Sequence, residues 1–393
     1  MPMHKPLRIL VIVDLAWDVR LGAVRVFMGL ADAWCAAGHS VEKYSLTDAF
    51  PIPSRSRFAS LFRQFVFPWK AAAFVRANRG RFDVIESLLG SLPFSKRQLR
   101  FRGLFVARSV GYYQLYRDLP QTREAPPRGK LSGRIVYPTV SKLISARSQR
   151  ALRQCDLLNL PNDEELRSLH EQLGPDKPAL VQPYGLSDER QRDLLQAMQP
   201  ASERLAKNKV SFIGMWSPRK GANDWRKIIR RVRAAVPDAR FLFLGTLVEA
   251  RQVLNDLAMP GVDFIDLVAE YRPEQLPKLL ADSAVGAFPS YAEAFGFGVL
   301  EQLAAGIPCV AYDAAGPRMI LEKHLPELLA PVSDFEKLAA TLVRVLRSDE
   351  TQYEELSRRC AETAARFDWA TIAEETAEVY RAHLSRNSMQ PQT

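Results

Sequence analysis

The run Ser290–Ala311 contains the residues of this chain that are best suited to chemistry. Glu293 and Glu301 lie eight positions apart, and a glycine-bearing turn between them leads into an apolar helix. The free amides of a helix start favour a phosphate group, and glycine lets the backbone approach a ligand closely. The candidate ligand-binding residues of this turn are Gly296, Phe297, Gly298 and Val299. Each glutamate can accept hydrogen bonds from sugar hydroxyls, so the pattern predicts an anion site flanked by two carboxylates.

A second cluster of candidate residues follows the predicted strand Val210–Ile213. It starts at Gly214 and carries two cations, Arg219 and Lys220, before Gly221 and a predicted helix. Ligands of open α/β sheets bind at the carboxyl ends of the strands, so both cations are expected at that edge. There they can bind a diphosphate without a metal ion.

The elements that must position these residues alternate between strand and helix. Predicted strands are Arg8–Val13, Val41–Tyr44, Phe82–Ile85, Leu104–Ala107, Asp156–Leu160, Val210–Ile213, Phe241–Leu244, Val262–Ile265, Ala284–Phe288 and Cys309–Ala311. Such alternation indicates doubly wound sheets, and 393 residues are too many for one ordinary core. We expect an N-terminal doubly wound domain over residues 1–190 and a C-terminal one over residues 205–365. A terminal helix over 366–385 is expected to pack back on the N-terminal domain.

The Glu-x7-Glu pattern of Glu293 and Glu301 resembles the signature of retaining nucleotide-sugar glycosyltransferases of family 4 (glycosyl transferases group 1). Pro289-Ser290 precedes it, and Gly306-x-Pro308 follows it. The segment from Gly214 to Gly221 is similar to the Gly-Arg-x4-Lys-Gly motif of the same family, with Met215 in the place of the arginine. The resemblance implies an α/β chain of the GT-B fold, in which two Rossmann-like doubly wound domains face each other across a cleft. Residues 1–190 would then form the acceptor-binding domain, and residues 205–365 the nucleotide-sugar donor domain.

The resemblance also implies a division of labour among these residues. Lys220 would stabilise the leaving nucleoside diphosphate, with Arg219 as the substitute for the missing arginine. Glu293 would bind the transferred sugar, Glu301 the ribose hydroxyls, and the amides near Phe295–Val299 the distal phosphate. The donor would be a UDP- or GDP-linked sugar, and the acceptor a glycan or a lipid-linked glycan, as in surface polysaccharide or glycolipid synthesis. Retention of anomeric configuration is implied, and no metal or other cofactor is expected.

In the N-terminal half the resemblance is looser. Residues 20–25 stand where the family has a Gly-Gly loop beside the donor phosphates, and only Gly22 is kept as a candidate donor-binding residue. In the run Arg108–Gly111, Val110 occupies the place of a family histidine, so that contact with the sugar is missing. Two alternatives therefore stay open. One is a degenerate glycosyltransferase-like protein that binds a membrane or a partner, and the other is a nucleotide-sugar epimerase of the same fold.

The charge of the chain is unevenly distributed. The net charge is +10, yet residues 50–155 alone contain 21 Lys or Arg and four acidic residues. Within Arg55–Arg81, cations alternate with aromatic residues and no acid interrupts them. This composition suits the interface of an anionic membrane, while the alternative is an ordinary helix with aromatics in the core and cations in water. No nucleic-acid motif accompanies the charge, so no nucleic-acid partner is expected.

The remaining composition points to a reducing compartment. The four cysteines are widely separated and are expected to be reduced and buried, and no histidine has metal-ligand spacing. Apolar runs are only strand-length, and no signal-peptide core follows the start. We expect a cytoplasmic protein, peripheral on the cytoplasmic face of the inner membrane if the basic stretch binds lipid.

Overall fold

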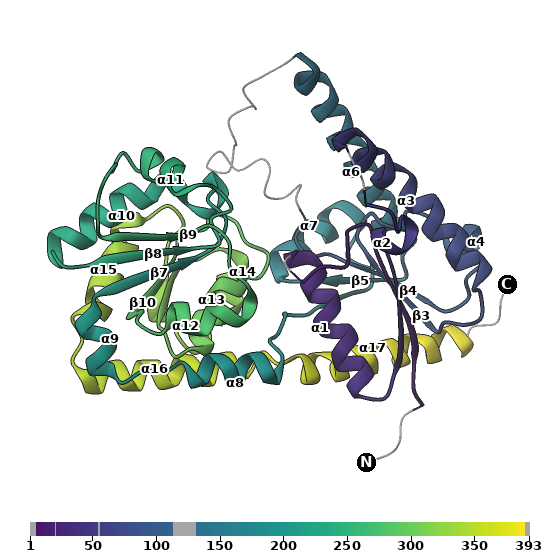
Figure 1. Cartoon of the computed structure of the whole chain (residues 1–393). Helices are drawn as coiled ribbons and strands as arrows, with labels where there is room; N and C mark the ends of the chain where they lie inside the picture. The colour runs from purple at the N-terminus through teal and green to yellow at the C-terminus, as the bar shows by residue number, and fades with distance from the viewer. Residues whose placement is uncertain (1–4, 20, 54–55, 113–130, 390–393) are drawn as a thin grey trace. The chain divides into compact units, whose positions relative to one another are not determined.

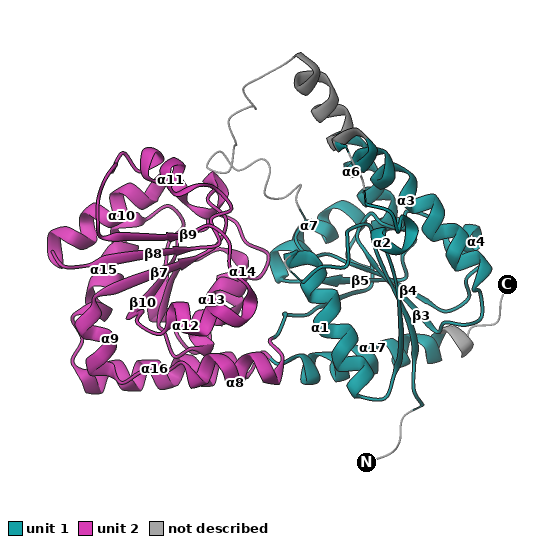
Figure 2. Ribbon diagram, in the orientation of Figure 1, with its two compact units in different colours: residues 1–112, 126–185, 368–393 teal, residues 113–125, 186–367 magenta. Residues whose placement is uncertain are grey.

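The computed structural model describes residues 5–19, 21–53, 56–112 and 131–389, and Figure 1 shows their course. These residues form two compact units (Figure 2). Unit 1 holds the described residues up to 112 together with 131–185 and 368–389, and unit 2 holds 186–367. Each unit is built on its own six-stranded sheet.

The sheet of unit 1 is parallel and runs in the order β2-β1-β3-β4-β5-β6. Its strands are β1 (Arg8–Val13), β2 (Ser40–Ser45), β3 (Val84–Leu88), β4 (Leu104–Arg108), β5 (Leu157–Leu160) and β6 (Ala179–Val181). The central strands are buried along nearly their whole length, as expected for apolar runs covered on both faces. The helices of this unit are α1 (Gly22–Ala36), α2 (Leu46–Ala49), α3 (Arg57–Ala77), α4 (Lys96–Leu99), α6 (Leu131–Gln154), α7 (Asp163–Leu173) and α17 (Trp369–Met389).

The sheet of unit 2 is also parallel, in the order β12-β11-β10-β7-β8-β9. Its strands are β7 (Lys209–Ile213), β8 (Arg240–Leu244), β9 (Ile265–Val268), β10 (Val285–Phe288), β11 (Cys309–Tyr312) and β12 (Leu329–Ala330). The α-helices are α8 (Asp188–Gln196), α9 (Ala201–Lys207), α10 (Ala222–Ala235), α11 (Ala250–Asp256), α12 (Leu276–Leu280), α13 (Phe297–Ala304), α14 (Ala315–Leu321), α15 (Phe335–Leu346) and α16 (Glu350–Ala365). Three 3₁₀ turns complete the unit, η2 (Pro218–Lys220), η3 (Pro273–Gln275) and η4 (Pro326–Leu328).

The order of the strands locates the expected ligand edge of unit 2. From β7 the chain adds β8 and β9 on one side, and then returns to add β10, β11 and β12 on the other. The direction of winding therefore reverses between β7 and β10, and ligands of such sheets bind at the carboxyl ends of the strands at this switch point. The two loops that leave β7 and β10 carry Lys220 and Glu293.

The prediction of two doubly wound α/β domains is confirmed, with differences in detail. Every predicted strand overlaps an observed one, but β9 starts only at Ile265, so the predicted strand at 262–265 was placed too early. The residues before Ile265 follow Gly261, whose φ of 73° turns the chain, and pairing with β8 begins at Ile265. The short edge strands β6 and β12 were missed, because two or three residues give no recognisable period. Cys35 is exposed, contrary to the prediction, whereas the other three cysteines are buried and all four are free.

The last helix, α17, closes a buried polar cluster in unit 1. Arg108 and Glu86 form an ion pair with both side chains fully buried, and the hydroxyl of Tyr380 on α17 donates to the same carboxylate. Burial, together with this carboxylate, raises the pKa of Tyr380, so the phenol stays a neutral donor. Trp34 of α1 also donates to the carbonyl of Ala373, at 3.0 Å. The C-terminal helix is thus held to the sheet by directional contacts as well as by packing.

The buried cluster predicts an unequal response to two mutations. Glu86→Leu leaves the Arg108 guanidinium buried without its acidic partner, which costs about 3–5 kcal/mol of unfolding free energy. The matched control is Glu42→Gln, which removes an exposed ion pair with Arg81 and costs about 0–1 kcal/mol. Urea unfolding followed by circular dichroism compares the two variants, and equal losses would contradict this account of unit 1.

Candidate active site

The loop after β7 brings two cations to the ligand edge of the unit 2 sheet. Gly214 ends the strand, η2 contains Arg219 and Lys220, and α10 starts directly after Gly221. Gly221 has a φ of 84°, and a Cβ there would lie 2.1 Å from the carbonyl oxygen of Pro289. Only glycine therefore allows this loop to approach the chain that leaves β10.

The loop after β10 brings the first glutamate to the same place. Glu293 lies between β10 and α13, and Gly296 is the N-cap of α13 with a φ of 102°. The helix fits closely over the end of β7, because a Cβ at Gly298 would lie 2.8 Å from the carbonyl oxygen of Ile213. Phe297 is half-buried and Val299 is buried. The Val299 amide donates to the carbonyl of Gly296 at 2.9 Å, so this predicted phosphate donor is already engaged within the helix.

The cations of one loop and the carboxylate of the other form an ion-pair cluster. Lys220 Nζ contacts a carboxylate oxygen of Glu293, and Arg219 Nη1 lies 3.6 Å from the same oxygen. The side chains of Lys220 and Glu293 are only 13% and 14% exposed, so water screens the pair weakly. Arg219 also donates to the carbonyl of Ala292 at 3.0 Å. Three of the predicted site residues are therefore in contact.

Burial and charge act in opposite directions on this cluster. Burial tends to raise the pKa of Glu293, but Lys220 and Arg219 outweigh it, and the pKa lies below its ordinary value of 4.5. Burial lowers the pKa of Lys220, and Glu293 offsets this only in part. The two cations therefore favour the charged form of Glu293, while burial works against the charge on Lys220.

A set of buried phenols supports the cluster from behind. Tyr291, two residues before Glu293, donates to Asp224 Oδ2 at 2.8 Å, and Tyr312 of β11 donates to the same oxygen at 2.7 Å. The Tyr291 amide also donates to the carbonyl of Arg219 at 3.0 Å. Besides the ion pair, the two loops are thus joined directly by the hydrogen bonds of the Tyr291 amide to Arg219 and of Arg219 to the Ala292 carbonyl. Sequence reasoning missed Asp224, since a lone acidic residue in the first turn of a helix gives no distinctive signal.

The second glutamate, Glu301, lies one turn inside α13 and has a different partner. Its side chain is 4% exposed and accepts a hydrogen bond from Arg190 Nη2 of α8 at 3.0 Å. The helix that carries it is fixed to β7 through Gln302, whose amide oxygen accepts from Ser211 Oγ at 2.8 Å. Sequence reasoning missed Arg190, because the linker before β7 carries many charged residues and none stands out.

The remaining predicted residues lie in unit 1. Gly22 is the first residue of α1, and an added Cβ there would have no atom within 4 Å. Val110 lies in the loop after β4, next to Ser109, whose hydroxyl donates to Glu165 at 2.5 Å. Over the ranges described, no three His, Cys, Asp or Glu side chains form a group that could hold a metal ion.

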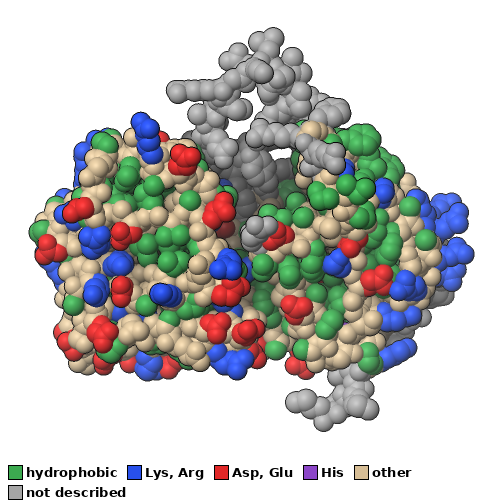
Figure 3. Space-filling model, in the orientation of Figure 1, with side chains coloured by type: hydrophobic (Ala, Val, Ile, Leu, Met, Phe, Trp, Pro, Cys, Tyr) green, Lys and Arg blue, Asp and Glu red, His purple; other side chains and the backbone are tan. Residues whose placement is uncertain are grey.

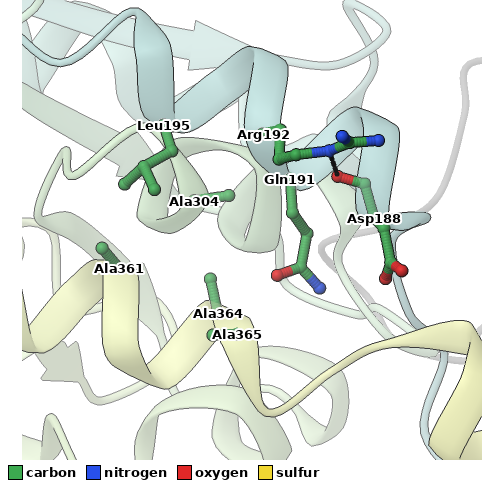
Figure 4. A pocket seen from close by; sticks show the side chains of 8 residues that line it. All are labelled: Asp188, Gln191, Arg192, Leu195, Ala304, Ala361, Ala364 and Ala365. Carbon is green, nitrogen blue, oxygen red and sulfur yellow. Dashed lines mark hydrogen bonds between the residues drawn. The ribbon is translucent and has the colours of Figure 1, made fainter.

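A separate cavity of unit 2 contains none of the predicted residues (Figure 4). It has a volume of about 520 Å³ and lies between α8 and α16, with Leu195 on one side and Ala361 on the other. Arg192 of α8 points along its rim and donates through Nε to the carbonyl of Asp188 at 3.2 Å. Four of its eight lining residues are alanines, and its polar side chains all come from α8, so none of the polar residues of the ion-pair cluster faces it.

Comparison with known protein families covers the part of the chain that carries the ion-pair cluster. Residues 207–348 match the family "Glycosyl transferases group 1". The matched domain begins just before β7 and extends through α15, so it includes Lys220, Glu293 and Glu301.

Relatives of known function are distant and cover part of the chain. A phosphatidyl-myo-inositol mannosyltransferase of Mycobacterium leprae is 29% identical over 187 residues, which are 47% of this chain and 49% of that protein. A D-inositol 3-phosphate glycosyltransferase of Corynebacterium efficiens is 26% identical over 247 residues, covering 59% and 58% of the two chains. This chain therefore spans about half the length of the curated relatives that it matches.

Solved structures extend the similarity to both units. A sucrose-phosphate synthase from Thermosynechococcus elongatus aligns over 96% of this chain and 100% of its own, with a TM-score of 0.69 and 20% identity. Anabaena Alr3699/HepE in complex with UDP and glucose aligns over 95% and 99%, with a TM-score of 0.64 and 16% identity. At these identities the likeness shows a common fold, and it confirms the predicted GT-B fold with two Rossmann-like domains.

The ion-pair cluster predicts a pH-dependent stability difference between wild type and Glu293→Gln. Because the pKa of Glu293 is lower in the fold than its ordinary 4.5, its stabilisation is complete above that pH. This stabilisation is lost as the pH falls through the lower pKa that Glu293 has in the folded protein. Near neutral pH the free energy of unfolding of the variant should be about 1.5–3 kcal/mol lower than that of wild type.

Urea unfolding of both proteins between about pH 7 and pH 3 measures this difference, which should shrink on acidification. The matched control is Glu336→Gln, whose exposed partner Arg231 lies at 2.5 Å and is screened by water. A difference for Glu293→Gln that stays constant over the whole range would contradict the assigned charge states.

Proposed function

We propose that this protein is a glycosyltransferase that transfers a sugar from a nucleotide-diphosphate sugar to a glycan or a lipid-linked acceptor. The observation that carries the proposal is the cluster of Arg219, Lys220 and Glu293 at the switch point of the unit 2 sheet. It joins two cations to a carboxylate beside the start of α13, within the domain that matches the glycosyl transferase family. Cations there suit a diphosphate, and a carboxylate suits sugar hydroxyls.

The chemistry of the proposed reaction depends on charge at the leaving group. Negative charge develops on the nucleoside diphosphate as the bond to the sugar breaks, and fixed cations near that position can supply most of the catalysis. Lys220, with Arg219, takes this role, and Glu293 then contacts the transferred sugar. Because both cations already face Glu293, an arriving diphosphate competes with that carboxylate for them. No metal ion is required, since the two side chains supply the positive charge.

The other roles follow from position on the same sheet edge. Glu301, inside α13, accepts hydrogen bonds from the ribose hydroxyls, and the backbone at Gly296 and Gly298 approaches the distal phosphate. UDP and GDP are the candidate nucleotides, and the complex of Alr3699/HepE with UDP supports the first. Retention of configuration belongs to the same proposal.

The alternative is a degenerate glycosyltransferase-like protein without turnover. Met215 stands in the place of the family arginine, and because methionine is uncharged it contributes no charge to the loop after β7. Its side chain is 44% exposed. An epimerase of the same fold is a further possibility for the same site, and it would consume a nucleotide sugar without an acceptor.

Calorimetric titration with UDP and GDP in the presence of EDTA tests the donor site. Wild type should bind one nucleotide, and Lys220→Ala or Glu301→Ala should weaken it at least about 30-fold, the effect of truncating one partner of a buried charged contact. Arg251→Ala, an exposed cation on α11, is the matched control and should bind like wild type. Binding of neither nucleotide would favour the degenerate protein, and an altered sugar without acceptor would identify an epimerase.

The acceptor side of the proposal includes a membrane surface on unit 1. Residues with large exposed apolar side chains gather on α3 and α6, and we call them the α3–α6 surface: Leu61, Phe62, Phe65, Trp69, Leu143 and Ile144. Phe62 is 58% and Trp69 49% exposed. Arg147 of α6 holds the two helices together, since it donates to the carbonyl of Phe65 at 2.7 Å and lies 5.0 Å from that ring. Figure 3 shows hydrophobic side chains over unit 1, with Lys and Arg along its edge.

The structure divides the aromatic residues of the basic stretch between two roles. Phe67 is buried, and Phe74 stacks on Tyr44 with ring centroids 4.3 Å apart, as the ordinary-helix alternative requires. The exposed aromatics of α3 instead support the interfacial hypothesis. Arg55 lies outside the described residues, as do the side chains of Arg57 and Phe58. In the part of the chain that the structure describes, no helix is long and apolar enough to cross a bilayer.

We therefore propose that the α3–α6 surface binds an anionic lipid surface and brings a lipid-linked acceptor to the enzyme at the cytoplasmic face of the membrane. This surface has three exposed aromatic residues, Phe62, Phe65 and Trp69, in a segment rich in cations, which is the combination that anchors interfacial helices.

Vesicle co-sedimentation tests this proposal. The protein should bind anionic vesicles better than neutral ones, and the double variant Phe62→Ser/Trp69→Ser should bind at least about tenfold more weakly, because each buried aromatic contributes about 1.5–3 kcal/mol. Leu247→Ser in unit 2, whose side chain is 57% exposed, is the matched control. Unchanged binding by the double variant would show that the α3–α6 surface does not bind the vesicles.

A further inference from the structure

Arg190 lies in the first turn of α8, immediately after the chain enters unit 2. The hydroxyl of Ser187 accepts a hydrogen bond from the Arg190 amide at 3.2 Å, so the start of the helix is fixed. The Leu186 amide donates to the carbonyl of Phe367 at 2.9 Å, which holds the preceding residue in place. The arginine therefore projects from an anchored position.

The guanidinium of Arg190 bridges two segments of unit 2. Nη2 donates to Glu301 Oε1 at 3.0 Å, and Nη1 donates to the carbonyl of Pro273 at 2.5 Å. The side chain is 12% exposed. Its Nε is buried and has no hydrogen-bond partner among the residues that the structure describes.

The two segments joined by Arg190 belong to the same edge of the sheet. Glu301 is carried by α13, whose start follows β10, and Pro273 starts the turn η3 that follows β9. Both strands are parallel members of one sheet, so their carboxyl ends lie at one edge. A planar guanidinium with a rigid set of donors can hold a carboxylate and a carbonyl in one fixed arrangement, which a lysine cannot do.

We propose that Arg190 is a positioning residue that presets Glu301 to accept the ribose hydroxyls of the nucleotide. This inference rests on the proposed function and extends it to the nucleoside. Arg190 occupies one oxygen of the carboxylate, fixes its orientation, and ties the turn η3 to the same side chain. Glu301 and the turn η3, which are expected to face the nucleoside, are then ordered before the nucleotide binds, and this lowers the entropic cost of binding.

The inference predicts that the ribose hydroxyls strengthen nucleotide binding through their contact with Glu301. A nucleotide without 2′- and 3′-hydroxyls cannot donate to Glu301, so wild type should bind it more weakly than the ribonucleotide. If Arg190 orients Glu301, this discrimination depends on the arginine even though Arg190 itself does not touch the nucleotide. A merely structural role would weaken both nucleotides equally.

The experiment compares UDP and GDP with their 2′,3′-dideoxy analogues by calorimetry, using wild type, Arg190→Gln and Arg190→Lys. Arg190→Gln should weaken binding of the ribonucleotide by about 10–100-fold, by analogy with the loss of a partner that orients a metal-ligating side chain. It should change the affinity for the dideoxy analogue much less. Arg190→Lys keeps the charge and loses the bridge, so it should recover part of the discrimination.

Arg192→Gln is the matched control, since this exposed arginine lies on the same helix but at the cavity of Figure 4, and among the described residues it hydrogen-bonds only to the Asp188 carbonyl. Combining Arg190→Gln with Glu301→Gln should cost no more than Glu301→Gln alone. Thermal unfolding of each variant verifies that it is folded.

Separate outcomes overturn the inference and the proposed function. If wild type binds a nucleotide and Arg190→Gln retains the full preference for the ribonucleotide, the inference is wrong and the donor site stands. An equal loss for both nucleotides, or additive losses in the double variant, would also overturn it. If wild type binds neither nucleotide, the proposed function fails and the inference fails with it.

Discussion

The contact between Lys220 and Glu293 is the interaction on which the organisation of unit 2 depends. It joins loops that leave two neighbouring strands at the point where the sheet changes its winding direction. Charges are costly to bury, so each partner is stable there mainly because the other is present. The close fit of Gly221 beneath the Pro289 carbonyl and the hydrogen bond from the Tyr291 amide to the Arg219 carbonyl hold the two loops together. Behind them, the hydroxyls of Tyr291 and Tyr312 both donate to Asp224.

The Glu293 carboxylate contacts both cations and so holds their side chains in place beside it. In the proposed function, a diphosphate with more negative charge competes with this carboxylate for them. The pair formed by Arg190 and Glu301 follows the same logic with the signs reversed, because there a cation keeps a carboxylate in place. Unit 2 thus holds two buried ion pairs with different proposed uses: both Lys220 and Glu293 are expected to meet the ligand, whereas of Arg190 and Glu301 only the carboxylate is.

The fold class could be predicted from the sequence, and the candidate site residues could be proposed from it, because both leave local signals. Apolar runs mark buried strands, and Gly221 after Lys220 and Gly296 after Glu293 mark the turns at their ends. The supporting residues leave no such signal. Arg190 is 111 positions from Glu301, and Asp224 is 67 positions from Tyr291, so only the folded chain brings each pair together. The same limit applies to the α3 aromatics, since composition alone could not separate the buried Phe67 from the exposed Phe62.

The return of α17 to unit 1 has a consequence for synthesis on the ribosome. Among the described residues, unit 2 is the continuous stretch 186–367, whereas unit 1 needs residues from both ends of the chain. Tyr380 completes the buried cluster of Glu86 and Arg108, and it is translated after the whole of unit 2. The second unit can therefore fold while the first still lacks a helix, which reverses the usual N-terminal-first order of co-translational folding. A nascent chain that stalls before α17 would expose the apolar face that Trp34 and its neighbours present to that helix.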